Sequence, residues 1–188
     1  GGGITTNSKK LIKRASKLRY CGIGKSGFDS ALTQDTNQLR WWEYNIEEPF
    51  IKMLPTNIAG AIGLAQLKKI DFLQARREEI WNTYQSELKN IDWIINPENI
   101  KSGDRHSYFT YCIKVPKRDE LANYLLRNKI YTTLRYHPLH LNPIYGQTNL
   151  RLKNSEILNE RGLNIPLHPR LTDAEVNKVI EKIKSFNI

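Results

Sequence analysis

Residues 55–67 read PTNIAGAIGLAQL, and this stretch decides the fold. Pro55 suits the first turn of a helix, because its fixed φ matches the helical value and an N–H there would have no partner. The apolar side chains that follow recur at helical spacing, at Ile58, Ala61, Ile62 and Ala65. Alanine and glycine fill much of the remaining surface. We therefore expect a helix that another element packs against closely.

On the C-terminal side, a second helical stretch carries apolar residues at Leu73, Ile80, Tyr84 and Leu88. Beyond residue 91 the pattern changes to short strands that alternate with helices. Strands are expected at residues 92–95, 107–115, 130–135 and 163–165, and helices at 117–128, at 152–162 and after Thr172. This order predicts a small α/β layer domain.

On the N-terminal side, Ile4-Thr5-Thr6 is a short β-like run, and Ser8 can cap a helix that ends near Gly22. Residues 22–40 are polar and predict a long exposed loop, and loops of that length are commonly functional or mobile. Residues 42–46 alternate and predict a strand.

Composition bounds the class of protein. With 188 residues and 39% hydrophobic content, the chain can build a core. No apolar run reaches the ~18–20 residues of a membrane helix, and the start at Gly1 does not resemble a signal peptide. The two cysteines, Cys21 and Cys112, have no surrounding pattern, which argues against a disulfide framework and favours a reducing cytoplasm.

The formal charge of +10 is compatible with several classes of binding partner. Such a balance suits nucleic acid, an anionic membrane or a phosphorylated small molecule. The basic residues are scattered through the helices, which also fits an ordinary solvated surface.

Two familiar motifs fail. A phosphate-binding loop needs GxxxxGK[ST], but before Gly24-Lys25-Ser26 its first glycine position holds Arg19, and a helix precedes the segment instead of a strand. Of the four histidines, His137 and His140 are near neighbours, yet zinc would require three or four ligands with cysteine or acidic partners. No metal site is expected.

Five segments resemble, in the same order, the DegT/DnrJ/StrS family of nucleotide-sugar aminotransferases. The strongest is PTNIAGAIGLAQL at residues 55–67, followed by KKID at 68–71 and by Arg76-Arg77. The other four are GGGITTN at residues 1–7, LRYCGI at 18–23, YHPLH at 136–140, and LNIPLHP at 163–169 followed by LT at 171–172.

The resemblance implies a fold. It is the C-terminal portion of an α/β, fold-type-I transferase that depends on pyridoxal 5'-phosphate (PLP). Residues 1–54 would be a remnant of the large domain with a long loop, residues 55–90 a helical connector with a dimer contact, and residues 91–188 a small α/β domain.

The resemblance also implies an activity. PLP takes an amino group, usually from glutamate, and passes it to a keto-sugar attached to a nucleotide, in polysaccharide or amino-sugar biosynthesis. The enzyme would be a cytoplasmic homodimer without nucleic-acid or membrane partners. The alternatives are the family's PLP-dependent sugar dehydratases, in which a histidine replaces the lysine, and a basic nucleic-acid-binding module.

The family's site residues carry over only in part. The segment that contacts the PLP phosphate of the partner subunit matches at Lys52 and Thr56, and we take Asn57, beside Thr56, as a third candidate cofactor residue. The usual asparagine is Leu54, whose side chain cannot donate a hydrogen bond. The Schiff-base lysine of the family would precede Gly1, so we expect no catalytic lysine in this chain, which would be inactive alone.

For the substrate, the resemblance points to the segment that leads to YHPLH. His140 matches the histidine that faces the substrate. Arg135 and Tyr136 precede it and would meet the anionic part of the sugar nucleotide, for which an arginine is well suited.

Overall fold

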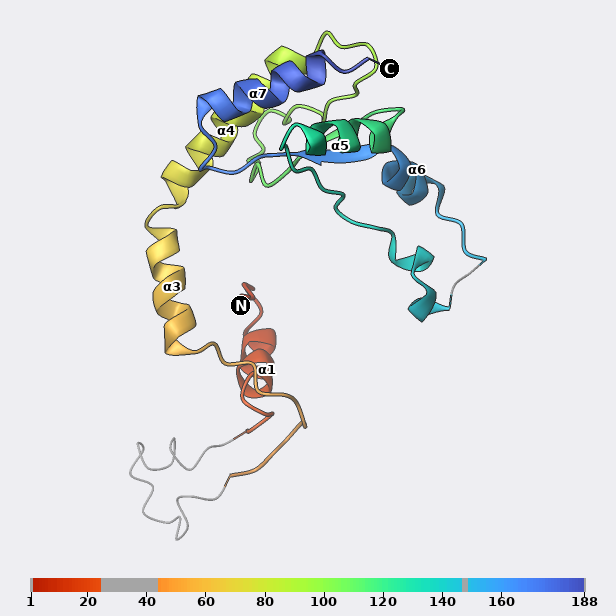
Figure 1. The fold of residues 1–188 in the computed structure, drawn as a ribbon. Coiled ribbons are helices and arrows are strands. Elements are labelled where there is room, and N and C mark those ends of the chain that lie inside the picture. Colours follow the sequence, from red (N-terminus) through yellow and green to blue (C-terminus); the bar gives the residue numbers. More distant parts are fainter. Residues whose placement is uncertain (1, 25–43, 147–148, 188) are drawn as a thin grey trace, which may run out of the picture. The chain divides into compact units, whose positions relative to one another are not determined.

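The computed structural model describes residues 2–24, 44–146 and 149–187 (Figure 1). They form two compact units, Gly1–Lys68 and Lys69–Ile188. The division falls inside the segment 55–90 that the sequence predicts as a connector. Most of the polar loop predicted at 22–40, and the start of the strand predicted at 42–46, lie outside the described residues.

The first unit contains helices α1 (Lys9–Leu18) and α3 (Asn57–Leu67). Ser8 caps α1 by accepting a hydrogen bond from the N–H of Leu11, as predicted. Isolated bridges pair Tyr20 with Lys52 and Ile23 with Ile46. The β-like run at residues 4–6 is not a strand, because none of the described residues pairs with it and a strand exists only through its neighbours.

Helix α3 confirms the helix predicted from residues 55–67, but it buries none of its side chains within the chain. Ile58 is 74% exposed, and Ile62, Leu64 and Leu67 are exposed as well. A helix that is apolar on all sides is normally covered by another element. Among the described residues, no element buries any side chain of α3.

The second unit is built on a small antiparallel sheet. Strand β1 (Tyr111–Lys114) pairs with β2 (Gly162–Ile165), in the register Tyr111 to Ile165. Single bridges extend the sheet from Lys114 to Ile95 and from Asn164 to Thr133. The four predicted strands therefore lie side by side, although two of them contribute only one bridge each. The predicted strand 107–115 is shortened, because Tyr108 adopts a φ of 47°.

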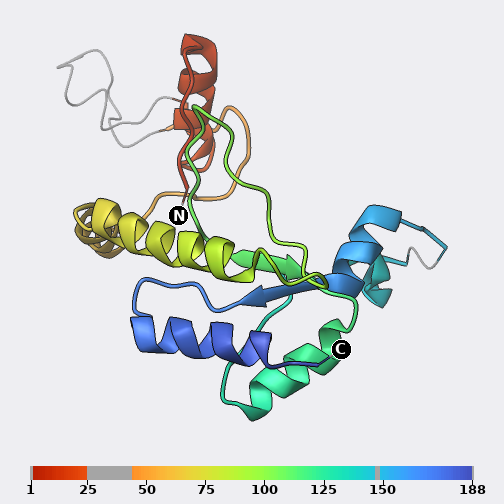
Figure 2. The same ribbon diagram turned by 90° about the horizontal axis from the view of Figure 1, so that it is seen from above.

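Four helices surround this sheet: α4 (Ile70–Leu88), α5 (Arg118–Arg127), α6 (Lys153–Arg161) and α7 (Asp173–Lys184). Two short 3-10 turns, η1 (Leu139–Leu141) and η2 (Pro143–Tyr145), precede α6. Helices α4 and α7 run alongside each other in both views (Figures 1 and 2). Thr172 and Glu175 form a capping box at the start of α7, which confirms the predicted cap.

The core of the second unit lies between the helices and the sheet. It joins the buried face of α4 to β1, β2, α5 and α7, and its fully buried large side chains are Tyr84, Tyr111, Ile80, Leu88, Ile113, Leu121, Leu125, Ile183 and Val115. The phenol of Tyr84 donates a hydrogen bond of 2.9 Å to the carbonyl of Pro166. Burial raises the pKa of this phenol above its ordinary value.

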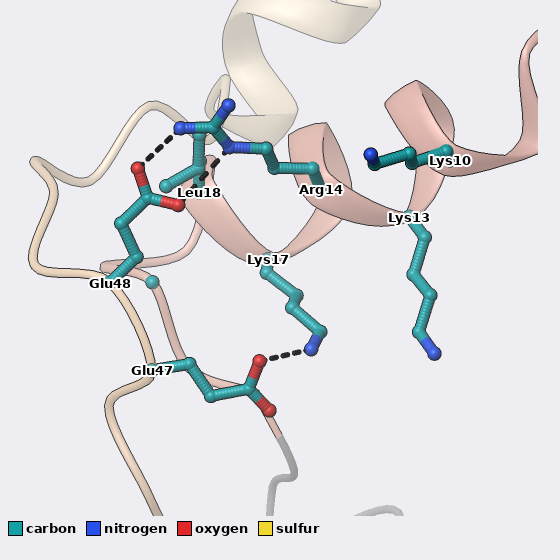
Figure 3. A pocket seen from close by; sticks show the side chains of 8 residues that line it. Lys10, Lys13, Arg14, Lys17, Leu18, Glu47 and Glu48 are labelled. Atoms are coloured by element: carbon teal, nitrogen blue, oxygen red, sulfur yellow. Dashed lines mark hydrogen bonds and ion pairs between the residues drawn. The ribbon is translucent and has the colours of Figure 1, made fainter.

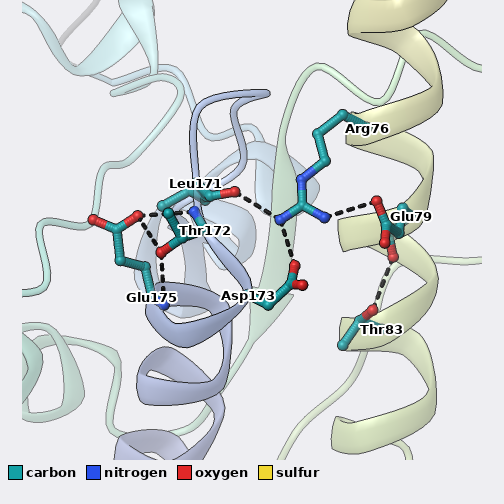
Figure 4. A network of polar contacts seen from close by, with 7 residues as sticks. All are labelled: Arg76, Glu79, Thr83, Leu171, Thr172, Asp173 and Glu175. Carbon is teal, nitrogen blue, oxygen red and sulfur yellow. Dashed lines mark hydrogen bonds and ion pairs between the residues drawn. The ribbon is translucent and has the colours of Figure 1, made fainter.

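Arg76 joins α4 to the start of α7 (Figure 4). Its guanidinium donates hydrogen bonds of 2.7 Å to the carboxylates of Glu79 and Asp173 and to the carbonyl of Leu171. The hydrogen bonds to Glu79 and then to Asp173 raise the pKa of Arg76 above its ordinary value. The arginine therefore fixes the loop before α7 against the middle of α4.

Candidate functional site

Two of the three predicted cofactor residues, Thr56 and Asn57, lie at the N-terminus of α3. Thr56 is the N-cap, and its hydroxyl oxygen accepts a hydrogen bond of 3.2 Å from the N–H of Ala59. Asn57 and Ile58 occupy the first two helical positions, where backbone N–H groups have no partner within the helix. Such N–H groups and the helix dipole attract anions, phosphate above all.

Lys52 lies on the strand-like segment that leads to this helix. It pairs with Tyr20 in an isolated bridge, and its ammonium nitrogen is 5.3 Å from the centroid of the Tyr20 ring. Leu54, between Lys52 and Thr56, brings no donor on its side chain. A lysine, a hydroxyl and the free N–H groups of a helix start are nevertheless a donor set that fits a phosphate, including that of PLP.

Arg135 lines an open groove in the second unit, with a volume of about 580 Å³. Its guanidinium carbon lies 5.0 Å from the centroid of the Phe109 ring, within the range of a cation–π contact. The other positively charged side chains that line this basic groove are Arg77, Lys129 and Lys178. Among the described residues that line it, Glu175 carries the one carboxylate, and the Thr172 cap holds the pKa of that carboxyl below its usual range.

Tyr136 and His140 do not line the basic groove. Tyr136 is 75% exposed, whereas the side chain of His140 is only 5% exposed. Within the described chain, no hydrogen bond or shared groove brings Arg135, Tyr136 and His140 together. The three predicted substrate residues are neighbours in sequence with three different environments.

Glu156, a residue that the sequence did not single out, is the partner of His140. Its Oε1 lies 3.0 Å from His140 Nε2 and also accepts a hydrogen bond of 2.9 Å from the N–H of Leu152. Its Oε2 lies 3.3 Å from a guanidinium nitrogen of Arg151. The bond from Leu152, followed by that from His140, holds the pKa of Glu156 below its usual range.

A second, smaller hollow of about 260 Å³ lies in the first unit beside α1 (Figure 3). Arg14 forms two hydrogen bonds with the carboxylate of Glu48, and Lys17 pairs with Glu47. Lys10 and Lys13 complete the basic side of the hollow. Acidic partners thus neutralise part of the basic face that dominates the charge of α1.

Glu156 could not be recognised from the sequence, because sixteen residues separate it from His140 and only the packing of α6 joins them. Phe109 was seen only as part of a strand. The described residues contain no group of three side chains arranged to hold a metal ion. Within the described part of the chain, no helix is both long and apolar enough to cross a membrane.

Comparison with solved structures defines the class. The aminotransferase TlmJ from Streptoalloteichus hindustanus superposes with a TM-score of 0.80 at 30% identity, over 95% of this chain and 45% of that one. The sugar aminotransferase CalS13 from Micromonospora echinospora also gives a TM-score of 0.80, with the same coverage. Its sequence is only 24% identical, so this likeness shows a shared fold and nothing more. The fold is therefore part of a sugar aminotransferase fold, and the fold class expected from the sequence is confirmed.

The chain belongs to the DegT/DnrJ/EryC1/StrS aminotransferase family, which it matches over residues 1–184. It is 33% identical to the dTDP-4-dehydro-2,3,6-trideoxy-D-glucose 4-aminotransferase of Saccharopolyspora spinosa, over 98% of this chain and 47% of that protein. It is 29% identical to the GDP-perosamine synthase of Caulobacter vibrioides, over 96% and 46%. The chain thus spans about half the length of the curated relatives it matches.

Proposed function

We propose that this chain is the C-terminal part of a PLP-dependent aminotransferase, which moves an amino group from an amino acid such as glutamate to a nucleotide-linked keto-sugar. The observation that carries the proposal is the family match over residues 1–184. The names of two relatives specify dTDP-linked and GDP-linked sugars. The proposal includes a cytoplasmic enzyme of polysaccharide or amino-sugar biosynthesis, and the sugar substrates in the names of these relatives support the biosynthetic role.

The N-terminus of α3 is the proposed anchor of the cofactor. Lys52 would neutralise the phosphate, while the Thr56 hydroxyl and the N–H groups of Asn57 and Ile58 would donate hydrogen bonds to it. These donors replace the one that Leu54 lacks. When bound, PLP supplies the electron sink for the reaction.

The substrate is proposed to contact the second unit. The guanidinium of Arg135, stacked on Phe109, suits a diphosphate because its planar donors can pair with two oxygens at once. Tyr136, which is exposed, would contact the same substrate. His140 would present a ring nitrogen to the substrate, for hydrogen bonding or proton transfer.

A homodimer is part of the proposal. Helix α3 exposes Ile58, Ile62, Leu64 and Leu67, and a second copy of the chain would cover them. Light scattering tests this point. Replacing Ile58 and Ile62 with asparagine should shift a dimer toward monomer, and a chain that is monomeric before the change would contradict it.

The activity is tested on the complete reading frame at the length of the relatives. The assay follows amino transfer from glutamate to a dTDP- or GDP-linked keto-sugar, together with the absorbance of enzyme-bound PLP. We expect Lys52→Met to weaken PLP retention by about 10–100-fold, the loss of one charged hydrogen bond. Lys68→Met, at the other end of α3, is the matched control.

The two outcomes separate the claims. If Lys52→Met retains PLP as well as Lys68→Met does, the anchor at α3 is wrong. If the enzyme holds PLP but transfers no amino group, the reaction is wrong and loss of water from the sugar is the next assay.

A further inference from the structure

The pairing of His140 with Glu156 determines which nitrogen of the imidazole carries hydrogen. His140 lies in η1, its side chain is almost fully buried, and its Nε2 is 3.0 Å from Glu156 Oε1. A neutral imidazole carries one hydrogen, on either Nε2 or Nδ1, and the hydrogen-bond partner selects the form.

Glu156 can only accept in this contact. Its carboxylate already receives the N–H of Leu152 on Oε1 and faces the guanidinium of Arg151 with Oε2. Both neighbours are donors, so they favour the ionised carboxylate, which has no hydrogen to give. The hydrogen between the two side chains therefore belongs to Nε2 of His140, and in the neutral ring Nδ1 is the nitrogen with the lone pair.

The carboxylate is itself held in place. Glu156 lies in the first turn of α6, where the helix dipole favours a negative charge, and Leu152 caps this helix without a side-chain bond of its own. The imidazole of His140 thus pairs with an acceptor whose position is fixed. His137 offers a contrast in the same unit, because it is exposed and its Nδ1 lies 3.3 Å from the amide oxygen of Asn159.

We propose that Glu156 is the positioning residue of His140: it holds the imidazole in the Nε2–H form, so that Nδ1 is the nitrogen offered to the substrate. The second half of this statement rests on the proposed function, in which His140 faces the sugar nucleotide. The first half concerns the chain alone.

The first experiment measures the form of the imidazole directly. Long-range 1H–15N spectra of the labelled 188-residue chain, recorded near pH 8 where histidine is mostly neutral, distinguish the two nitrogens. We expect hydrogen on Nε2 alone for His140. Glu156→Gln, whose amide can donate as well as accept, should give a mixture of both forms. Glu160→Gln, on the same helix, should leave His140 unchanged.

A merely structural role for Glu156 has a different signature. If Glu156 serves only to cap α6, Glu156→Gln will lower stability while His140 keeps hydrogen on Nε2, and the proposal is overturned. If Glu156→Gln fails to fold, Glu156→Asp gives the same comparison, because it keeps the charge near the start of α6 but shortens the reach to His140.

The second experiment uses the complete reading frame. Glu156→Gln should lower kcat about tenfold with little change in KM, as expected when a group is misplaced for the reaction but not for binding. A change of form at His140 with unaltered kcat would refute the role of Nδ1 and leave the pairing itself intact. Loss of activity in Glu160→Gln as well would show that the effect is not specific to the pair.

Discussion

Replacing Arg76 with methionine tests how the second unit is held together. The methionine keeps most of the aliphatic stem but removes the three hydrogen bonds to Glu79, Asp173 and Leu171. Two of these bonds connect α4 to Leu171, in the loop before α7, and to Asp173, the first residue of α7, while the bond to Glu79 stays within α4. The arginine side chain that makes them is only 18% exposed. Losing these bonds should therefore weaken the contact between α4 and the start of α7 and leave the helices themselves intact.

The expected magnitude follows from the exposure of each partner. Glu79 and Asp173 are 62% and 81% exposed, so water screens both ion pairs and each contributes about 0.2–1 kcal/mol. The bond to the carbonyl of Leu171 is partly buried and charge-assisted, and contributes about 1.5 kcal/mol. We expect Arg76→Met to lower the free energy of unfolding by about 2 kcal/mol in total.

Urea unfolding measures this loss. Near-ultraviolet circular dichroism reports on the second unit, because the ring of Trp81 lies 4.8 Å from that of Tyr111 in its core. With a denaturant slope of about 2 kcal/mol/M, the midpoint should fall by about 1 M. Arg77→Met is the matched control, since Arg77 bonds only Gln74 on its own helix among the described residues, and it should change the midpoint by less than about 0.3 M.

Two results would refute this reasoning. Equal midpoints for Arg76→Met and Arg77→Met would show that the contacts to the loop before α7 add nothing. A loss that disappears entirely in about 1 M salt would show that only the screened ion pairs matter and that the bond to Leu171 does not.

Two further predictions concern the same core. Tyr84→Phe removes the hydrogen bond to Pro166 and should cost about 1 kcal/mol in urea unfolding at neutral pH. Burial raises the pKa of Tyr84 above its ordinary value of 10.0, so the unfolded chain loses the phenolic proton at a lower pH than the folded chain does. The free energy of unfolding should therefore fall as the pH rises above about 10, and it should fall less steeply in Tyr84→Phe. Equal slopes of stability against pH in the two proteins would contradict this prediction. Gly162→Ala should cost about 1–3 kcal/mol, since the added Cβ would lie 2.6 Å from the carbonyl oxygen of Leu158. An alanine variant as stable as the parent chain would show that α6 shifts freely.

Much of the second unit could be predicted from local patterns. The helices of 117–128, 152–162 and beyond Thr172 follow from apolar spacing and caps, which are local signals. The strand lengths could not be predicted, because pairing depends on partners far along the chain. Tyr108, in the left-handed region, interrupts the extended backbone, so β1 begins only at Tyr111, later than its aromatic and β-branched sequence indicated.

Of the candidate site, too, only the part that depends on local sequence could be predicted. The helix at 55–67 was predictable, although Pro55 lies just before the Thr56 cap and not in the first turn. The role of its N-terminus as a phosphate anchor stays a prediction. The environment of His140 was not predictable, because it depends on how α6 packs against η1. The resemblance gave His140 only as a histidine that faces the substrate, and its buried contact with Glu156 appears only in the structure.

Helix α3 has a consequence for how the chain acquires its structure. No side chain of this helix is buried among the described residues, and an isolated helix of eleven residues is marginal in water. In the proposed dimer, the order of α3 would come from association and would therefore depend on concentration. Hydrogen exchange in α3 should slow as the protein is concentrated, while the core of the second unit exchanges at the same rate throughout.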